Sequence, residues 1–159
     1  MKRLPKKLAL LILLILSIVA LSNAEQVEVR NVRELTTPSD VIARVSLVCV
    51  IDKGASEGYT KIAYAKVTDP IKGLKPDSIL EIENDAAGVV CPNVSYAVGE
   101  DVLVFATRMA NGHYQTLYAE TGKFLIENGL IDKHPFRKGS NYASARREVE
   151  RELGKRDRK

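Results

Sequence analysis

An alternation of apolar and polar side chains over residues 41–51 constrains the fold of this chain more than any other feature. Every odd position of the segment is apolar, and Arg44 and Ser46 occupy even positions. A two-residue repeat rich in β-branched side chains is typical of a half-buried strand. The segment is therefore predicted to be a strand that directs Cys49, at an odd position, into the core.

Further strand-like segments follow, separated by turn residues. They are predicted at 59–68, 78–83, 102–106, 114–118, 123–126 and 130–131. The strand at 102–106 is apolar on both faces and should be the most buried one. A loop is expected at 69–76, and Asn111-Gly112 and Asn128-Gly129 favour type I′ hairpin turns. Apart from a short lead-in helix near 32–35, this region predicts one all-β domain, a small barrel or a sandwich.

The first 24 residues have the pattern of a secretory signal peptide. Basic residues precede a largely apolar run from Leu8 to Leu21, and Ser22-Asn23-Ala24 offers small residues to a signal peptidase. The alternative is an uncleaved anchor helix. A 14-residue helix would span only about 21 Å, however, and the apolar core of a bilayer is roughly 30 Å thick. We therefore expect cleavage after Ala24 and a secreted or periplasmic mature protein.

Charge divides the mature chain into two parts. Residues 25–132 hold 16 acidic and 10 basic residues, whereas residues 133–159 hold 4 acidic and 10 basic residues. In the second part, Ala145, Val149 and Leu153 recur every four residues, which predicts a marginal helix with one narrow apolar stripe. The sequence thus predicts an acidic β domain at 25–132 and a basic, partly helical or disordered tail at 133–159 that is separable from it.

Cys49 and Cys91 are the two cysteines of the chain. In an oxidising compartment such a pair usually forms a disulfide, which here would close about 43 residues and contribute about 4 kcal/mol. The alternative is two free buried thiols. His113 and His134 show no ligand spacing with the cysteines, so neither a metal site nor a cofactor is predicted.

Several short motifs resemble one known family. They are Asp40-Val41-Ile42, Tyr64-Ala65-Lys66-Val67 running into Ile71-Lys72-Gly73, the loop with Cys91, and residues 98–105 with Val-Gly-Glu before an apolar strand. This order resembles the netrin-like modules related to tissue inhibitors of metalloproteinases, as found in secreted bacterial proteins. The resemblance covers about residues 31–131 and implies an OB-type five-stranded barrel. Together with the strand pattern it leads us to expect an all-β fold, a small OB-type barrel of five to six strands with a short C-terminal helix.

The chain departs from that family in two ways. The inhibitors bind the protease zinc through an N-terminal cysteine, whereas the mature chain here is predicted to begin with Glu25-Gln26. The family's second cysteine, after the Val-Gly-Glu strand, is also absent. The resemblance therefore does not imply metalloproteinase inhibition, and a bridge between Cys49 and Cys91 would differ from the usual one.

The residue types argue against catalysis and against nucleic-acid binding. Ser56 stands in a Gly-x-Ser-x-Gly match (Gly54-Ala55-Ser56-Glu57-Gly58), but this segment is predicted to be a turn between two strands, whereas the nucleophile elbow needs a strand followed by a helix. His113 follows a hairpin glycine at an expected exposed tip, and Glu81 and Glu83 are expected on a solvent face. Nucleic-acid sites need a positive groove with stacking aromatics, but residues 25–132 are acidic and the chain has no tryptophan.

We therefore expect an exported binding or interaction module without catalytic activity, whose partner is an unknown protein or envelope component. The alternative is a cell-envelope enzyme whose site is not visible in the sequence. The basic tail is a second candidate contact, with an anionic surface. A solvated mixed-charge helix is the favoured interpretation, because Glu148, Glu150 and Glu152 interrupt the positive run.

Export should remove residues 1–24, because the small residues at 22–24 follow the apolar run directly. Intact-mass measurement of the exported protein should give the mass of residues 25–159. A full-length mass in the exported pool would contradict the predicted cleavage.

Overall fold

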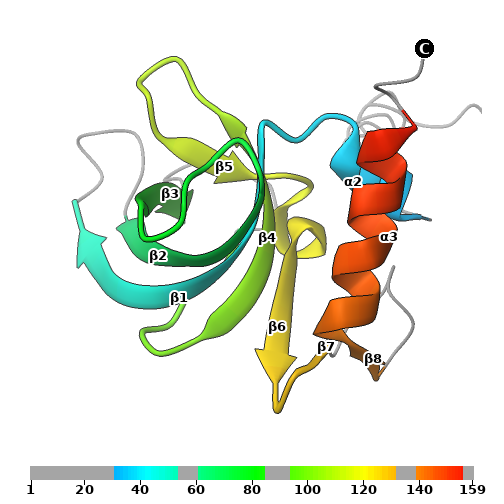
Figure 1. Cartoon of the computed structure of the whole chain (residues 1–159). Coiled ribbons are helices and arrows are strands. Elements are labelled where there is room, and N and C mark those ends of the chain that lie inside the picture. Colours follow the sequence, from blue (N-terminus) through cyan, green and yellow to red (C-terminus); the bar gives the residue numbers. More distant parts are fainter. Residues whose placement is uncertain (1–30, 54–60, 85–93, 132–138, 156–159) are drawn as a thin grey trace, which may run out of the picture.

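A computed structural model of the chain describes residues 31–53, 61–84, 94–131 and 139–155. The predicted signal peptide at 1–24, Cys91 and His134 lie outside these ranges. Within them, five strands form a closed barrel in the order β1-β2-β3-β5-β4, with β4 returning to β1 (Figure 1). Their bounds are β1 Val41–Asp52, β2 Lys61–Lys72, β3 Ile79–Asn84, β4 Asp101–Arg108 and β5 Tyr114–Thr116.

The pairing pattern identifies the barrel type. Strands β3 and β5 are parallel, and every other pair in the barrel is antiparallel. A five-stranded barrel of this small all-β kind is OB-type. The predicted fold class is therefore confirmed, and of the two architectures left open by the strand pattern the chain adopts the barrel.

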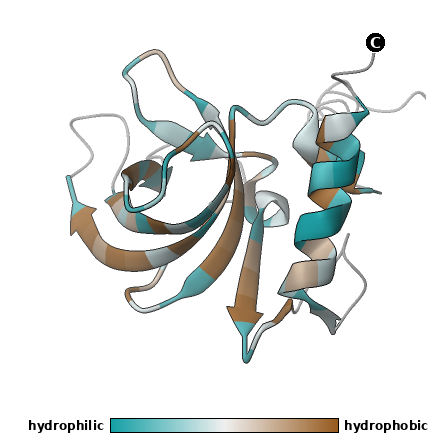
Figure 2. Ribbon diagram, viewed as in Figure 1, coloured by the Kyte–Doolittle hydropathy of each residue, from teal (hydrophilic) through white to brown (hydrophobic). Residues whose placement is uncertain are grey.

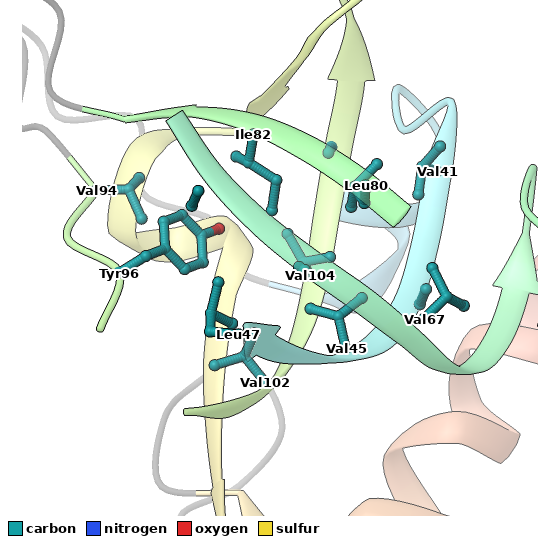
Figure 3. Packing of buried hydrophobic residues seen from close by; sticks show 14 residues of the cluster. Val41, Val45, Leu47, Val67, Leu80, Ile82, Val94, Tyr96, Val102 and Val104 are labelled. Atoms are coloured by element: carbon teal, nitrogen blue, oxygen red, sulfur yellow. The ribbon is translucent and has the colours of Figure 1, made fainter. Parts of the chain in front are cut away.

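The barrel interior is filled by small and β-branched side chains that alternate along each strand. Ala63 and Ala65 of β2 face larger residues of the neighbouring strands, so the layers fill a narrow space. Tyr96 closes one end, and its hydroxyl shares a 2.7 Å hydrogen bond with Thr116. Figure 3 shows this cluster, which comprises Val41, Ala43, Val45, Leu47, Ala63, Ala65, Val67, Leu80, Ile82, Val94, Tyr96, Val102, Val104 and Ala106.

A β-bulge in β1 corrects the prediction for Cys49. Leu47 pairs with Ala65 and Cys49 pairs with Tyr64, so one extra residue of β1 lies between these pairs. An extra residue reverses which side chains face inward. Leu47 is buried and Val50 packs against the core, whereas Cys49 is exposed. The expectation that Cys49 points into the core was wrong, because the alternation does not run unbroken through the strand.

Strand β4 supplies a second core on the outside of the barrel. Leu103 and Phe105 point away from the interior. The rings of Phe105 and Phe124 pack edge to face, with 5.8 Å between their centroids and an interplanar angle of 87°. Residues 102–106 are all buried, as predicted for the most buried strand. This outer core is completed by helix α2 (Val32–Thr36), β6 (Lys123–Glu127), β7 (Leu130–Ile131) and helix α3 (Tyr142–Gly154).

Helix α3 lies beside α2 and β6 on one side of the barrel (Figure 1). The predicted helix is present, and the short strand β8 (Ser140–Asn141) pairs with β7 immediately before it. Asn141 caps the helix by accepting a 2.8 Å hydrogen bond from the Ser144 N–H. Figure 2 shows a largely hydrophilic α3, yet Ala145 and Val149 are 1% and 0% exposed in the outer core. The helix therefore packs on the barrel instead of standing apart from it.

One predicted turn is present, a second takes another form, and one predicted loop begins later. Asn128 and Gly129 both have positive φ, as the predicted type I′ turn requires, but at Asn111-Gly112 only the glycine does. There the Gly112 N–H donates to Met109 O and the Met109 N–H donates to His113 O, so a longer hairpin loop forms. The predicted loop at 69–76 begins later, because β2 continues to Lys72. Pro70 is tolerated in the strand because it lies at a register shift, where its missing N–H is not needed for pairing with β1.

Replacing Val149 by alanine should lower the free energy of unfolding by about 2 kcal/mol, because it removes buried methyl groups from the outer core. Urea unfolding followed by circular dichroism measures this change. The matched control is Arg147→Ala, at an exposed position of the same helix, which should change stability little. Equal stability of Val149→Ala and the parent protein would show that α3 is separable.

Candidate functional site

A polar cluster lies on the outer surface of β3. Glu81 and Glu83 alternate along this strand with Leu80 and Ile82, which are buried in the barrel core. Tyr64 of β2 pairs with Glu81 in the sheet. The carboxylates therefore project from the barrel beside the β4–β5 hairpin.

The parallel β3–β5 pairing brings the hairpin over these carboxylates. Ile82 pairs with Tyr114, the residue that follows His113. At the base of the hairpin, the Asp40 carboxylate accepts 2.8 Å hydrogen bonds from the Arg108 N–H and the Thr107 hydroxyl. These bonds hold the pKa of Asp40 below its ordinary value, with the backbone bond from Arg108 the larger cause. The hairpin is thus fixed at both the β1 and the β3 side.

His113 contacts both carboxylates. Its Nδ1 lies 3.2 Å from Glu83 Oε1, and its Nε2 lies 3.3 Å from Glu81 Oε2. Asn111 donates from Nδ2 to Glu83 Oε1 at 2.5 Å, and its Oδ1 accepts a 3.1 Å bond from the His113 N–H. The imidazole ring is therefore oriented by the turn on one side and by two glutamates on the other.

Burial within the cluster is uneven. The Glu83 side chain is 11% exposed and that of His113 is 22% exposed, whereas Glu81 is 44% exposed. The expectation of a solvated Glu81 and Glu83 face, with His113 at an exposed tip, therefore holds only for Glu81. The alternation in the sequence predicted that both glutamates point outward. No feature of the sequence predicted that Glu83 contacts Asn111 and His113.

This arrangement has a definite chemical capacity. Carboxylate oxygens accept hydrogen bonds from ammonium and guanidinium groups, and Glu81 has the exposure needed to reach such a group from solvent. The described residues contain no group of three or more histidines, cysteines, aspartates or glutamates suited to hold a metal ion. The site therefore suits recognition of a positively charged group.

A second polar region joins the barrel to α3. It surrounds an open hollow of about 310 Å³ lined by Arg44, Ser46, Thr68, Asp69 and Asp101. Arg44 donates from Nε to both carboxylate oxygens of Asp101, at 2.9 and 3.1 Å, and its guanidinium lies 4.9 Å above the Tyr142 ring. The bond to Asp101 raises the pKa of Arg44 above its ordinary value.

The helix contributes the other half of this region. The Tyr142 hydroxyl donates to Asp69 at 2.8 Å, and Arg146 Nε lies 3.1 Å from the same carboxylate. Burial, followed by the bond to Asp69, raises the pKa of the Tyr142 phenol. Because these charged groups pair with one another, the region explains how α3 is held and offers less to a ligand than the β3 cluster does.

Of the two cysteines predicted to bridge, the structure places Cys49 on the surface of β1, and Cys91 lies outside the described residues. The bridge stays a prediction. Among the helices that the structure describes, none combines the length and apolar character needed to cross a bilayer. Comparison of the chain with protein-family models, curated proteins and solved structures gives no match.

Peptide mapping of the exported protein without reduction should recover Cys49 and Cys91 in one linked peptide, which reduction separates. The predicted export favours the bridge, since thiol pairs are oxidised outside the cytoplasm. Alkylation of both thiols in the native, unreduced protein would refute it.

Proposed function

We propose that the mature protein is an exported, non-catalytic binding module that recognises a positively charged segment of a protein or envelope component. The observation that carries the proposal is the Glu81–His113–Glu83 cluster on the outer surface of the barrel. OB-type barrels commonly bind ligands on the face of strands 2 and 3 and on the adjoining 4–5 loop, which is where this cluster lies. That support is an analogy between folds, and the residues supply the chemistry.

The charge of the cluster favours a basic partner over a nucleic acid. Two carboxylates repel phosphate groups. The aromatic residue beside them, Tyr64, pairs with Glu81 across the strands, so a base stacked on Tyr64 would bring its phosphates close to that negative charge. A lysine or arginine of a partner could instead donate to Glu81 from solvent.

The basic tail is a less favoured contact. Arg151 lies within 3.7 and 3.8 Å of Glu148 and Glu152, and Lys155 donates to Glu152 at 2.5 Å. The Lys155 bond lowers the pKa of Glu152, so this carboxylate remains charged beside the basic residues. Because these pairs offset the positive charge of α3, we place the partner on β3 and not on an anionic surface at the tail.

We propose the netrin-like relation on the sequence motifs. Two of them are neighbours in the fold, since Val41 and Ile42 pair with Ala106 and Phe105. The Cys49–Cys91 bridge and cleavage after Ala24 belong to the same proposal, because a disulfide and a signal peptide both accompany export.

The double variant Glu81→Gln/Glu83→Gln should bind a basic partner about fivefold more weakly, the value expected from losing ion pairs worth about 1 kcal/mol in total. The probe is a fluorescent oligolysine peptide that is acetylated at its N-terminus only, so that the lysine side chains stay charged. It is titrated at low ionic strength, and binding is followed by fluorescence anisotropy. Glutamine keeps the side-chain volume and removes the charge.

The matched control is Glu127→Gln/Glu148→Gln, which makes the same change in net charge on β6 and α3. It should leave the affinity nearly unchanged. Equal losses in both double variants, or no loss in the β3 variant, would contradict a binding site at the cluster.

A further inference from the structure

We propose that His113 controls this site by taking up a proton, so that a cationic partner binds at neutral pH and is released in mild acid. This inference rests on the proposed function, since it concerns the same carboxylates. Its structural basis is that the two ring nitrogens face oxygens of two different glutamates, at 3.2 and 3.3 Å.

A neutral imidazole cannot satisfy both contacts. It carries one N–H donor and one nitrogen lone pair, so one of the two glutamates faces a lone pair. The protonated ring has two N–H donors and can donate to Glu81 and Glu83 at once. Protonation therefore adds a second ring donor, so that the ring can bond to both carboxylates and not to one alone.

The ring is held in position for this role. Its backbone N–H donates to Asn111 Oδ1 at 3.1 Å, and the Met109 N–H donates to the His113 carbonyl at 2.8 Å. Asn111 also donates to Glu83, so the hairpin and β3 are linked whether or not the ring is protonated. A change in ring charge is thus transmitted to the carboxylates without a rearrangement of the hairpin.

Other charged and titratable groups lie on the strands packed beside the cluster. On β2, Tyr64 pairs with Glu81 and Lys61 pairs with Asn84, the residue after Glu83. On the hairpin, Arg108 of β4 pairs with Tyr114 of β5. Histidine is the side-chain type that ordinarily changes charge between pH 5 and pH 8. The proposal therefore places the exchangeable proton on the His113 ring, whose two nitrogens face the two carboxylates.

The sign of the effect follows from competition. With a neutral ring, Glu81 and Glu83 carry two negative charges. With a protonated ring the cluster carries one net negative charge, and one oxygen of each carboxylate is engaged by the ring. A proton on His113 and a lysine of the partner therefore compete for the same acceptors, so each weakens binding of the other.

The anchor of the hairpin persists over the same pH range. The pKa of Asp40 is lowered by its bonds from Arg108 and Thr107, so its stabilising contribution is present above the ordinary aspartate range and is lost only below it. A loss of binding between pH 8 and pH 5 is thus not a loss of this anchor.

The test measures the affinity for the N-terminally acetylated oligolysine peptide by fluorescence anisotropy, at a series of pH values from 8 to 5 and at constant ionic strength. The affinity of the parent protein should fall about fivefold across this range, the effect of one added positive charge at a partly exposed pair. His113→Gln should bind with little dependence on pH. His134→Gln, which removes the only other histidine of the chain, should behave like the parent.

A second measurement follows the ring directly. Long-range ¹H–¹⁵N correlation spectra of the imidazole should show both nitrogens of His113 protonated at pH 5, and added peptide at intermediate pH should shift the ring toward its neutral form. A ring that does not respond to the peptide would overturn the inference.

The outcomes separate the two proposals. Binding that Glu81→Gln/Glu83→Gln weakens but that does not change with pH would overturn the role of His113 and leave the binding site standing. A pH dependence that persists in His113→Gln would do the same. Absence of peptide binding at every pH would overturn the proposed function, and the regulation with it.

Discussion

Strand β4 carries apolar side chains on both faces, and the two cores of the protein meet across it. Val102 and Val104 fill the barrel, whereas Leu103 and Phe105 pack outward against β6 and the helices. A strand of this kind cannot lie at a surface, because either exposed face would leave apolar area in water. The barrel must therefore close on one side of β4, and α3 must cover the other.

Polar groups complete the surfaces that these cores leave open. Beside α3, Arg44 joins Asp101 of the barrel to the ring of Tyr142, so the helix is oriented as well as buried. Beside β3, the hairpin places His113 between two glutamates. Both regions contain internal ion pairs, but they differ in exposure: the charged side chains of the first are 31–38% exposed, whereas Glu81 of the second is 44% exposed. This difference in exposure is why we assign binding to β3.

The proposed function depends on a small number of atoms. One imidazole ring faces two carboxylates, and in the proposed regulation its charge decides whether they are available to a cationic partner. No change of fold is needed, because Asp40 and Asn111 hold the hairpin in place. The barrel thus provides the geometry, and the proposed regulation adds an exchangeable proton.

The sequence by itself determined that strands β1 to β7 and helix α3 exist, although not where each ends, since most of them follow from side-chain repeats of two or four residues. It also determined the burial of residues 102–106 on both faces, since this run is apolar throughout. The side to which Cys49 points was decided by the tertiary structure, because a bulge adds one residue and reverses the alternation. The packing of α3 against the barrel was also decided by the tertiary structure. The narrow apolar stripe of the helix is buried because it belongs to the same cluster as Phe105 and Phe124. The outward direction of Glu81 and Glu83 was predictable. Their contact with His113, thirty residues from Glu83 along the chain, exists only because the parallel β3–β5 pairing closes the barrel there.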